Sequence, residues 1–243
     1  MSRWLAFTLV ALANVAEAGP KPRYRLPPLP SLRAMTRAAA EDREPLAPRC
    51  FAYSTKHHVF ACVGHASIFN RNDVGAEDQA TNLRIDVVGP RPASWTIAAI
   101  GERPTTRRAT VEGELGELGL RALTAVPVTI VPKTWVKVGS AQLFLRVDTH
   151  EGDASFENFG ELTLRCGNVP DRVVDLRAAG MTLGDTAVAY LSPDKSWLAI
   201  SIVGLDGGEG AYDYRLDTAV IDLTATCTHR DPSLWTTISR AAR

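Results

Sequence analysis

The chain has 243 residues, of which 45% are hydrophobic and 22% are charged, a composition typical of one globular domain or two small ones. Its 27 basic residues balance its 27 acidic residues, so the formal net charge is zero. Without a basic excess the chain lacks the charge that drives non-specific nucleic-acid binding, and nucleic acid is not an expected partner. Beyond the first twenty residues, no apolar run reaches the roughly 18 residues of a membrane-spanning helix, so we expect no further membrane span.

The N-terminus has the pattern of a secretory signal peptide. Arg3 precedes an apolar run over residues 4–13, and the small residues Ala16 and Ala18 stand where a signal peptidase would cleave. A buried N-terminal helix and a membrane anchor are the alternatives, although the run is too short to span a bilayer. We therefore expect residues 1–18 to be removed and the protein to be exported, to a periplasm or to the extracellular space.

A proline-rich stretch follows the signal pattern. Residues 19–30 contain five prolines, which favour an extended backbone, so this stretch predicts a spacer outside the core. Residues 32–43 are rich in Ala and Arg and predict a short helix. We expect residues 19–48 to form a tether and residues 49–243 to form a single β-rich globular domain.

The tether gives way to short β-branched and aromatic runs separated by polar loops, a pattern typical of β-strands. The sequence therefore predicts a mainly β (α+β) fold, dominated by antiparallel sheet, with a propeller-like arrangement as a minor alternative. Trp95, Trp135 and Trp197 fall inside these runs and are expected in the core. The predicted strands are 50–54, 59–68, 83–88, 95–100, 120–124, 128–131, 135–138, 142–147, 161–166, 187–191, 197–203 and 217–223.

Two helices are expected to accompany the sheet. Val111, Leu115 and Leu118 have helical spacing, which predicts one helix at about 105–118. A short C-terminal helix is expected at 232–240, where a proline in the first turn precedes an apolar stripe.

The cysteines are Cys50, Cys62, Cys166 and Cys227. In an exported chain, this even number predicts two disulfides. Four cysteines allow three connectivities, and the sequence does not choose among them, although Cys50 and Cys62 could close a hairpin and leave Cys166 to pair with Cys227. Four free, buried thiols are the alternative.

A metal site at Cys62 is not expected. His57, His58 and His65 lie near it in sequence, but alternation along a strand points Cys62 and His65 to opposite faces. Such a site would also need a reduced Cys62 and a ligand from elsewhere in the chain.

Two acidic segments are the candidate sites. Residues 148–160 and 203–213 are each predicted to be a loop between strands, longer than a tight hairpin needs. They could form the recognition edge of a binding module, hold a calcium ion through their oxygens, or supply Glu151 and Glu209 as the paired carboxylates of a hydrolase. The candidate residues are Asp148, Glu151, Asp153, Asp206, Glu209 and Asp213, with Tyr212 and Tyr214 as aromatic contacts for a sugar or a partner protein.

The sequence contains no nucleophile elbow, zinc-binding helix motif or phosphate-binding loop, so it assigns no catalytic residue. Calcium is the one cofactor for which the acidic segments provide candidate ligands. We therefore expect an exported, non-catalytic binding or structural protein with a partner in the cell envelope or outside the cell, and we keep the hydrolase and the calcium-stabilised domain as alternatives.

Overall fold

The computed structural model describes residues 22–29, 31–32, 49–70, 79–99, 107–152, 155–167, 169–175, 187–208, 211–228 and 237–239. Its strands are β1 (Arg49–Ser54), β2 (Val59–Asn70), β3 (Gln79–Val88), β4 (Ala93–Ala99), β5 (Arg121–Ala122), β6 (Val128–Ile130), β7 (Trp135–Val138), β8 (Ala141–Gly152), β9 (Ser155–Cys166), β10 (Arg172–Asp175), β11 (Ala187–Leu191), β12 (Trp197–Gly208), β13 (Ala211–Asp222) and β14 (Thr237–Ser239). Its helices are α2 (Arg108–Glu117) and α3 (Leu223–Thr228).

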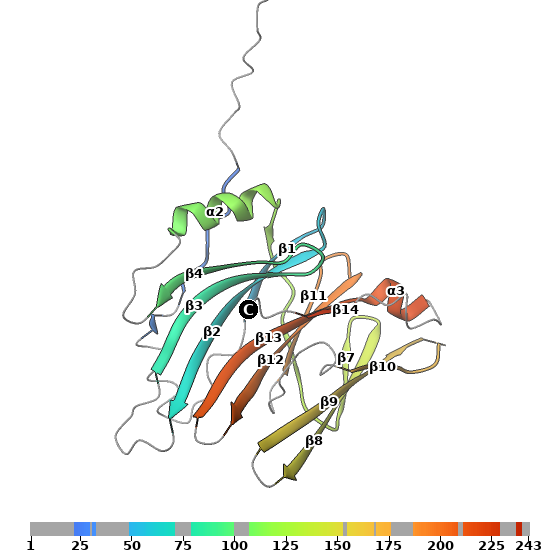
Figure 1. Cartoon of the computed structure of the whole chain (residues 1–243). Helices are drawn as coiled ribbons and strands as arrows, with labels where there is room; N and C mark the ends of the chain where they lie inside the picture. Colours follow the sequence, from blue (N-terminus) through green and yellow to red (C-terminus); the bar gives the residue numbers. More distant parts are fainter. Residues whose placement is uncertain are drawn as a thin grey trace, which may run out of the picture.

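The described strands form two antiparallel sheets (Figure 1). The larger has ten strands in the order β4-β3-β2-β13-β12-β11-β6, with β1 paired to β2 and β5, and β14 paired to β13. The smaller has four strands in the order β10-β9-β8-β7. This mainly β, antiparallel architecture confirms the predicted fold class, and its ten-stranded sheet differs from the four-stranded blades of a propeller.

Each of the twelve predicted strand stretches contains a strand, while β10 and β14 were not predicted. The helix expected at about 105–118 is α2, and Gly119 follows it with a φ of 65°, the left-handed conformation that ends many helices. The chain also has a short helix near its C-terminal end, but this is α3. Placing that helix at 232–240 was wrong for residues 237–239, which form β14 and pair with β13; residues 229–236 lie outside the described part of the chain.

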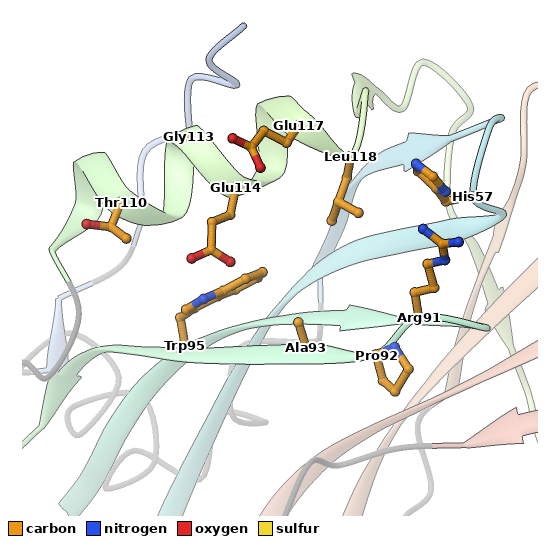
Figure 2. A pocket seen from close by; sticks show the side chains of 10 residues that line it. All are labelled: His57, Arg91, Pro92, Ala93, Trp95, Thr110, Gly113, Glu114, Glu117 and Leu118. Atoms are coloured by element: carbon orange, nitrogen blue, oxygen red, sulfur yellow. The ribbon is translucent and has the colours of Figure 1, made fainter. Parts of the chain in front are cut away.

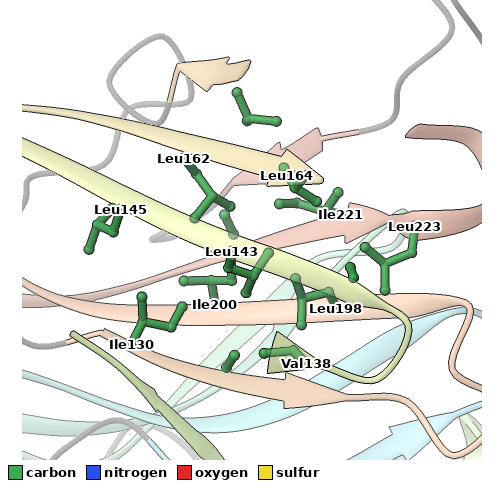
Figure 3. Packing of buried hydrophobic residues seen from close by; sticks show 14 of the residues in the cluster. Ile130, Val138, Leu143, Leu145, Leu162, Leu164, Leu198, Ile200, Ile221 and Leu223 are labelled. Carbon is green, nitrogen blue, oxygen red and sulfur yellow. The ribbon is translucent and has the colours of Figure 1, made fainter. Parts of the chain in front are cut away.

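A leucine-rich core joins the small sheet to the large one (Figure 3). Leu143 and Leu145 of β8 alternate with exposed or half-buried residues, so these leucines share one face of the strand and are fully buried. Side chains of β11, β12 and β13 pack against this face, among them Leu198 and Ile200. Because both partners are sheets, period-two alternation determines which residues enter the core.

A second cluster connects β1, β2 and β3 with β11, β12 and β13. Phe60 of β2 is fully buried, and Trp197 of β12 is also in this cluster, so the expectation that Trp197 is a core residue is correct. Trp135 instead is 37% exposed on the small sheet, which contradicts its predicted core position. In β7 the exposed Trp135 and Lys137 alternate with Val136 and Val138, which pack on the leucine-rich core, so Trp135 lies on the other face of the strand.

The third cluster lies under α2 (Figure 1). Val111 and Leu115 of α2 pack against β1, β2 and β3, together with Leu26 of the proline-rich stretch, which is only 3% exposed. The backbone N–H of Tyr24 donates to the carbonyl oxygen of Glu112 at 2.8 Å. Residues 22–29 are therefore packed on the domain, and the expectation that the proline-rich stretch lies outside the core is wrong for them.

The rest of the domain division stays a prediction. Residues 1–21, which include the signal pattern, and residues 33–48, which include most of the helix expected at 32–43, lie outside the described residues. Among the helices that the structure describes, none combines the length and the apolar composition that crossing a membrane would require.

All four cysteines are paired, in two disulfides. Cys50 and Cys62 face each other across β1 and β2, and Cys166 at the end of β9 is joined to Cys227 of α3. The second bond links the small sheet to α3, the helix that directly follows β13 of the large sheet. The alternative of four free thiols is therefore wrong, and a metal site at Cys62 is excluded because its sulfur is oxidised. Two disulfides are typical of a protein in an oxidising, non-cytoplasmic location.

Candidate functional site

The two acidic segments are long hairpins rather than loops. Pairing between β8 and β9 continues to Gly152 opposite Ser155, and pairing between β12 and β13 continues to Gly208 opposite Ala211. Their Gly, Asp and Glu content is typical of turns, but main-chain hydrogen bonds extend a hairpin irrespective of such side chains once its register is set. The prediction of long loops was therefore wrong.

The candidate residues of these segments are in separate sheets. Asp148 and Glu151 belong to β8, whereas Asp206 of β12 lies opposite Asp213 of β13 in the strand register, next to the pair formed by Gly207 and Tyr212. Tyr214 follows in β13 opposite Leu205. For these residues only the backbone is described, and Asp153 and Glu209 lie outside the described residues. Calcium binding and paired-carboxylate hydrolysis stay predictions.

The structure reveals a different candidate site, an open groove of about 760 Å³ between α2 and β4 (Figure 2). This volume lies within the usual range of ligand pockets. The groove also reaches the turns that follow β1 and β3. Its lining residues are His57, Arg91, Pro92, Ala93, Trp95, Thr110, Gly113, Glu114, Glu117 and Leu118.

The floor of the groove belongs to β4. Ala93 and Trp95 are two residues apart, so they point to the same face of the strand, the face covered by α2. In Figure 2 the indole ring of Trp95 lies flat below the carboxylate of Glu114. Trp95 is half-buried, and its predicted core position is only partly correct, because the ring packs on the third cluster and also lines the groove.

The wall of the groove is the polar side of α2. Thr110, Gly113, Glu114 and Glu117 are spaced by three, four and seven residues, which places them on one face of the helix. The apolar residues Val111 and Leu115 point toward the sheet. This amphipathic pattern makes one side of α2 a core element and leaves another side available to a ligand.

Charged side chains of both signs line the groove. Glu114 and Glu117 line it on the helix side, and His57 and Arg91 lie at the far end (Figure 2). Desolvation lowers the pKa of His57 below its usual value, and the positive charges of Arg91 and Lys56 lower it further. His57 is therefore mainly neutral at pH 7, and Arg91 supplies the positive charge at this end.

Hydrogen bonds fix the turn that carries His57. The hydroxyl of Ser54 donates to the carbonyl oxygen of Leu118 at 2.6 Å, which ties the turn to the C-terminal end of α2. The neighbouring His58 hydrogen-bonds the Tyr53 hydroxyl through Nδ1 at 3.1 Å and stacks on Trp197, with the ring centres 5.3 Å apart. The basic end of the groove is thus built on a supported turn.

None of the groove residues was among the candidates from sequence. They come from three separate stretches around residues 57, 91–95 and 110–118, and no motif connects these stretches. The polar face of α2 was the one available signal, because helical spacing predicts that Glu114 and Glu117 lie opposite the buried stripe.

Comparison with known proteins gives no match to this chain, either among protein-family models, among curated proteins or among solved structures.

Proposed function

We propose that this chain is an exported, non-catalytic binding protein that holds its ligand in the groove between α2 and β4. The observation that carries the proposal is the placement of Trp95, whose indole ring forms the floor of an open groove directly below Glu114. An aromatic face that lines a groove supplies rigid, amphipathic contact area for a ligand.

The charges along the groove favour a ligand that carries both signs. A cationic group above Trp95 would gain from the ring and from the Glu114 carboxylate together. An anionic group at the other end would meet the guanidinium of Arg91, which presents a planar set of donors suited to carboxylates. A dipolar ligand would therefore bind in one orientation.

Export is part of the proposal. The signal-peptide pattern of residues 1–18 supports it, and the two disulfides are what an oxidising destination allows a protein to keep. The supported turns and the disulfide-linked sheets suit a rigid scaffold, which reduces the entropy lost when a ligand binds.

The test is a parallel screen of the protein against a random dodecapeptide display library and a glycan array. We expect ligands from at least one source that bind about tenfold more weakly to Trp95→Ala, because losing an aromatic and cation contact removes roughly 1–2 kcal/mol. Trp135→Ala is the matched control, since Trp135 is a partly exposed tryptophan of the other sheet.

A supporting ligand binds Trp95→Ala more weakly than the wild type and binds Trp135→Ala as well as the wild type. The proposal fails if neither source yields such a ligand. Near-ultraviolet circular dichroism and the melting temperature show whether Trp95→Ala is folded. If it is not, Glu114→Gln replaces it in the comparison, because Glu114 is exposed and the substitution preserves side-chain shape.

A further inference from the structure

We infer that the ligand is an extended peptide that adds to β4 as a further strand of the large sheet, an inference that rests on the proposed function. β4 is the terminal strand of this sheet, and among the described strands it pairs only with β3. The other edge of such a strand presents backbone N–H and C=O groups that an incoming peptide can pair with.

The sequence of β4 does not protect this edge. Its seven residues, ASWTIAA, include no charged side chain and no proline, the residues that natural proteins place on edge strands to block pairing. Its tryptophan, threonine and isoleucine are residue types that favour a further strand. Within the described part of the chain, the pairing of β4 with β3 shifts register at Ile97, so the regular edge that a further strand can use is formed by residues 93–96, beside the groove.

The groove follows this edge. α2 runs beside β4, with Thr110 near Trp95 at one end and Leu118 toward Arg91 at the other (Figure 2). A peptide paired with β4 would lie alongside the helix, and every second side chain would enter the groove because strand residues alternate between faces. The helix wall then selects those side chains, while the main chain of β4 supplies hydrogen bonds that any sequence can make.

The charges define the peptide further. Arg91 lies in the bend that precedes β4, four residues before Trp95, and this separation corresponds to at most about 13 Å at roughly 3.3 Å per residue of extended chain. The sheet is antiparallel throughout its described pairs, so we assign the peptide the antiparallel direction. A basic residue above Trp95 and Glu114 would then precede, by about four positions, an acidic residue or the terminal carboxylate near Arg91.

The experiment takes dodecapeptides retained by the wild-type protein in the display selection, made as free synthetic peptides. Each backbone amide is methylated in turn, which removes one donor without changing the side chain. We expect binding to fall about tenfold at every second position within the paired stretch and to change little between them, because alternate amides of a strand point away from its partner.

Two further results are expected from the same peptides. Most should carry a basic residue followed about four positions later by an acidic group, and exchanging the two charges should weaken binding by about tenfold. Trp95→Ala and Glu114→Gln should each weaken binding by a similar factor, and Trp135→Ala should not.

The outcomes separate this inference from the proposed function. If binding of the peptides depends on Trp95 but methylation shows no alternation, strand addition is wrong and the groove is still a binding site. The same conclusion holds if Trp95-dependent glycans are found and no Trp95-dependent peptide is. If sedimentation shows a dimer that the selected peptides do not dissociate and that Trp95→Ala abolishes, a second copy occupies the edge and the inference is wrong. If neither source yields a Trp95-dependent ligand, both proposals fail.

Discussion

Replacing Gly116 with alanine should detach residues 22–29 from α2. A Cβ atom at Gly116 would overlap the carbonyl oxygen of Pro22 and lie 2.8 Å from the Cα of Arg23, closer than the 3.0 Å limit that real Cβ atoms respect. Both atoms belong to the backbone, so no side-chain rotation relieves the overlap. The segment must move away from the helix.

The expected cost follows from what holds the segment. Burial of the Leu26 side chain contributes about 1.5–3 kcal/mol. Hydrogen bonds from Leu26 N to Glu112 Oε1 at 3.1 Å and from Arg108 Nη2 to Leu26 O at 2.7 Å add about 1 kcal/mol each. Chain entropy regained on release and the higher helix propensity of alanine offset part of this sum. We expect Gly116→Ala to lower the free energy of unfolding by about 2 kcal/mol.

Gly113→Ala is the matched control in the same helix. A Cβ at Gly113 meets no atom within 4 Å, so this variant gains only the propensity of alanine, about 1 kcal/mol. Denaturant unfolding measures both changes, and hydrogen exchange at the Tyr24 and Leu26 amides reports on docking directly. If both variants were equally stabilised and those amides stayed protected in Gly116→Ala, the assigned role of Gly116 would be refuted.

Two other predictions concern the disulfides and a buried carboxyl group. In denaturant unfolding, removing the Cys166–Cys227 bond should lower the free energy of unfolding by about 4 kcal/mol, and removing the Cys50–Cys62 bond should lower it by about 3 kcal/mol. The first bond closes the longer loop, because its sequence separation is 61 and that of the second is 12. The opposite ranking would contradict the chain-entropy argument. Burial raises the pKa of Asp86 in the folded state, so the folded protein binds more protons there than the unfolded chain does. The stability of the wild type relative to Asp86→Asn should therefore fall as pH rises through the raised pKa. If the difference in the free energy of unfolding between the two proteins stayed constant from about pH 4 to about pH 8, this assignment would be refuted.

The strands were predictable where burial requires a run of apolar side chains. In β2, Phe60 and Cys62 face one cluster and Val59 and Ala61 face another, so this stretch is apolar on both faces. The extensions of β12 and β13 were not predictable, because residues such as Gly207 and Gly208 are held in the strand by main-chain pairing alone. The C-terminal helix was misplaced for a related reason: β14 is formed by pairing with β13, and a helical spacing of apolar residues does not reveal that partner.

The candidate site was harder to predict than the fold. The helix α2 and its buried stripe followed from spacing, but the groove exists only because β4 and two turns meet the polar side of that helix. These contacts join residues far apart in sequence, and no local pattern encodes them. Trp95 shows the limit of prediction from sequence, because an aromatic residue in a strand pattern is expected to lie in the core. Only the position of β4 at the end of the sheet allows Trp95 to line the groove as well.

The helix that forms the groove wall depends on the segment that docks behind it. α2 has ten residues and no side-chain hydrogen bond at its N-cap, and a helix of this length is marginal on its own in water. Packing of Val111 and Leu115 on the sheet holds one side, and Glu112 accepts hydrogen bonds from the backbone of residues 22–29. The proline-rich stretch therefore supports the groove without lining it, because it holds in place the helix whose other side forms the groove wall.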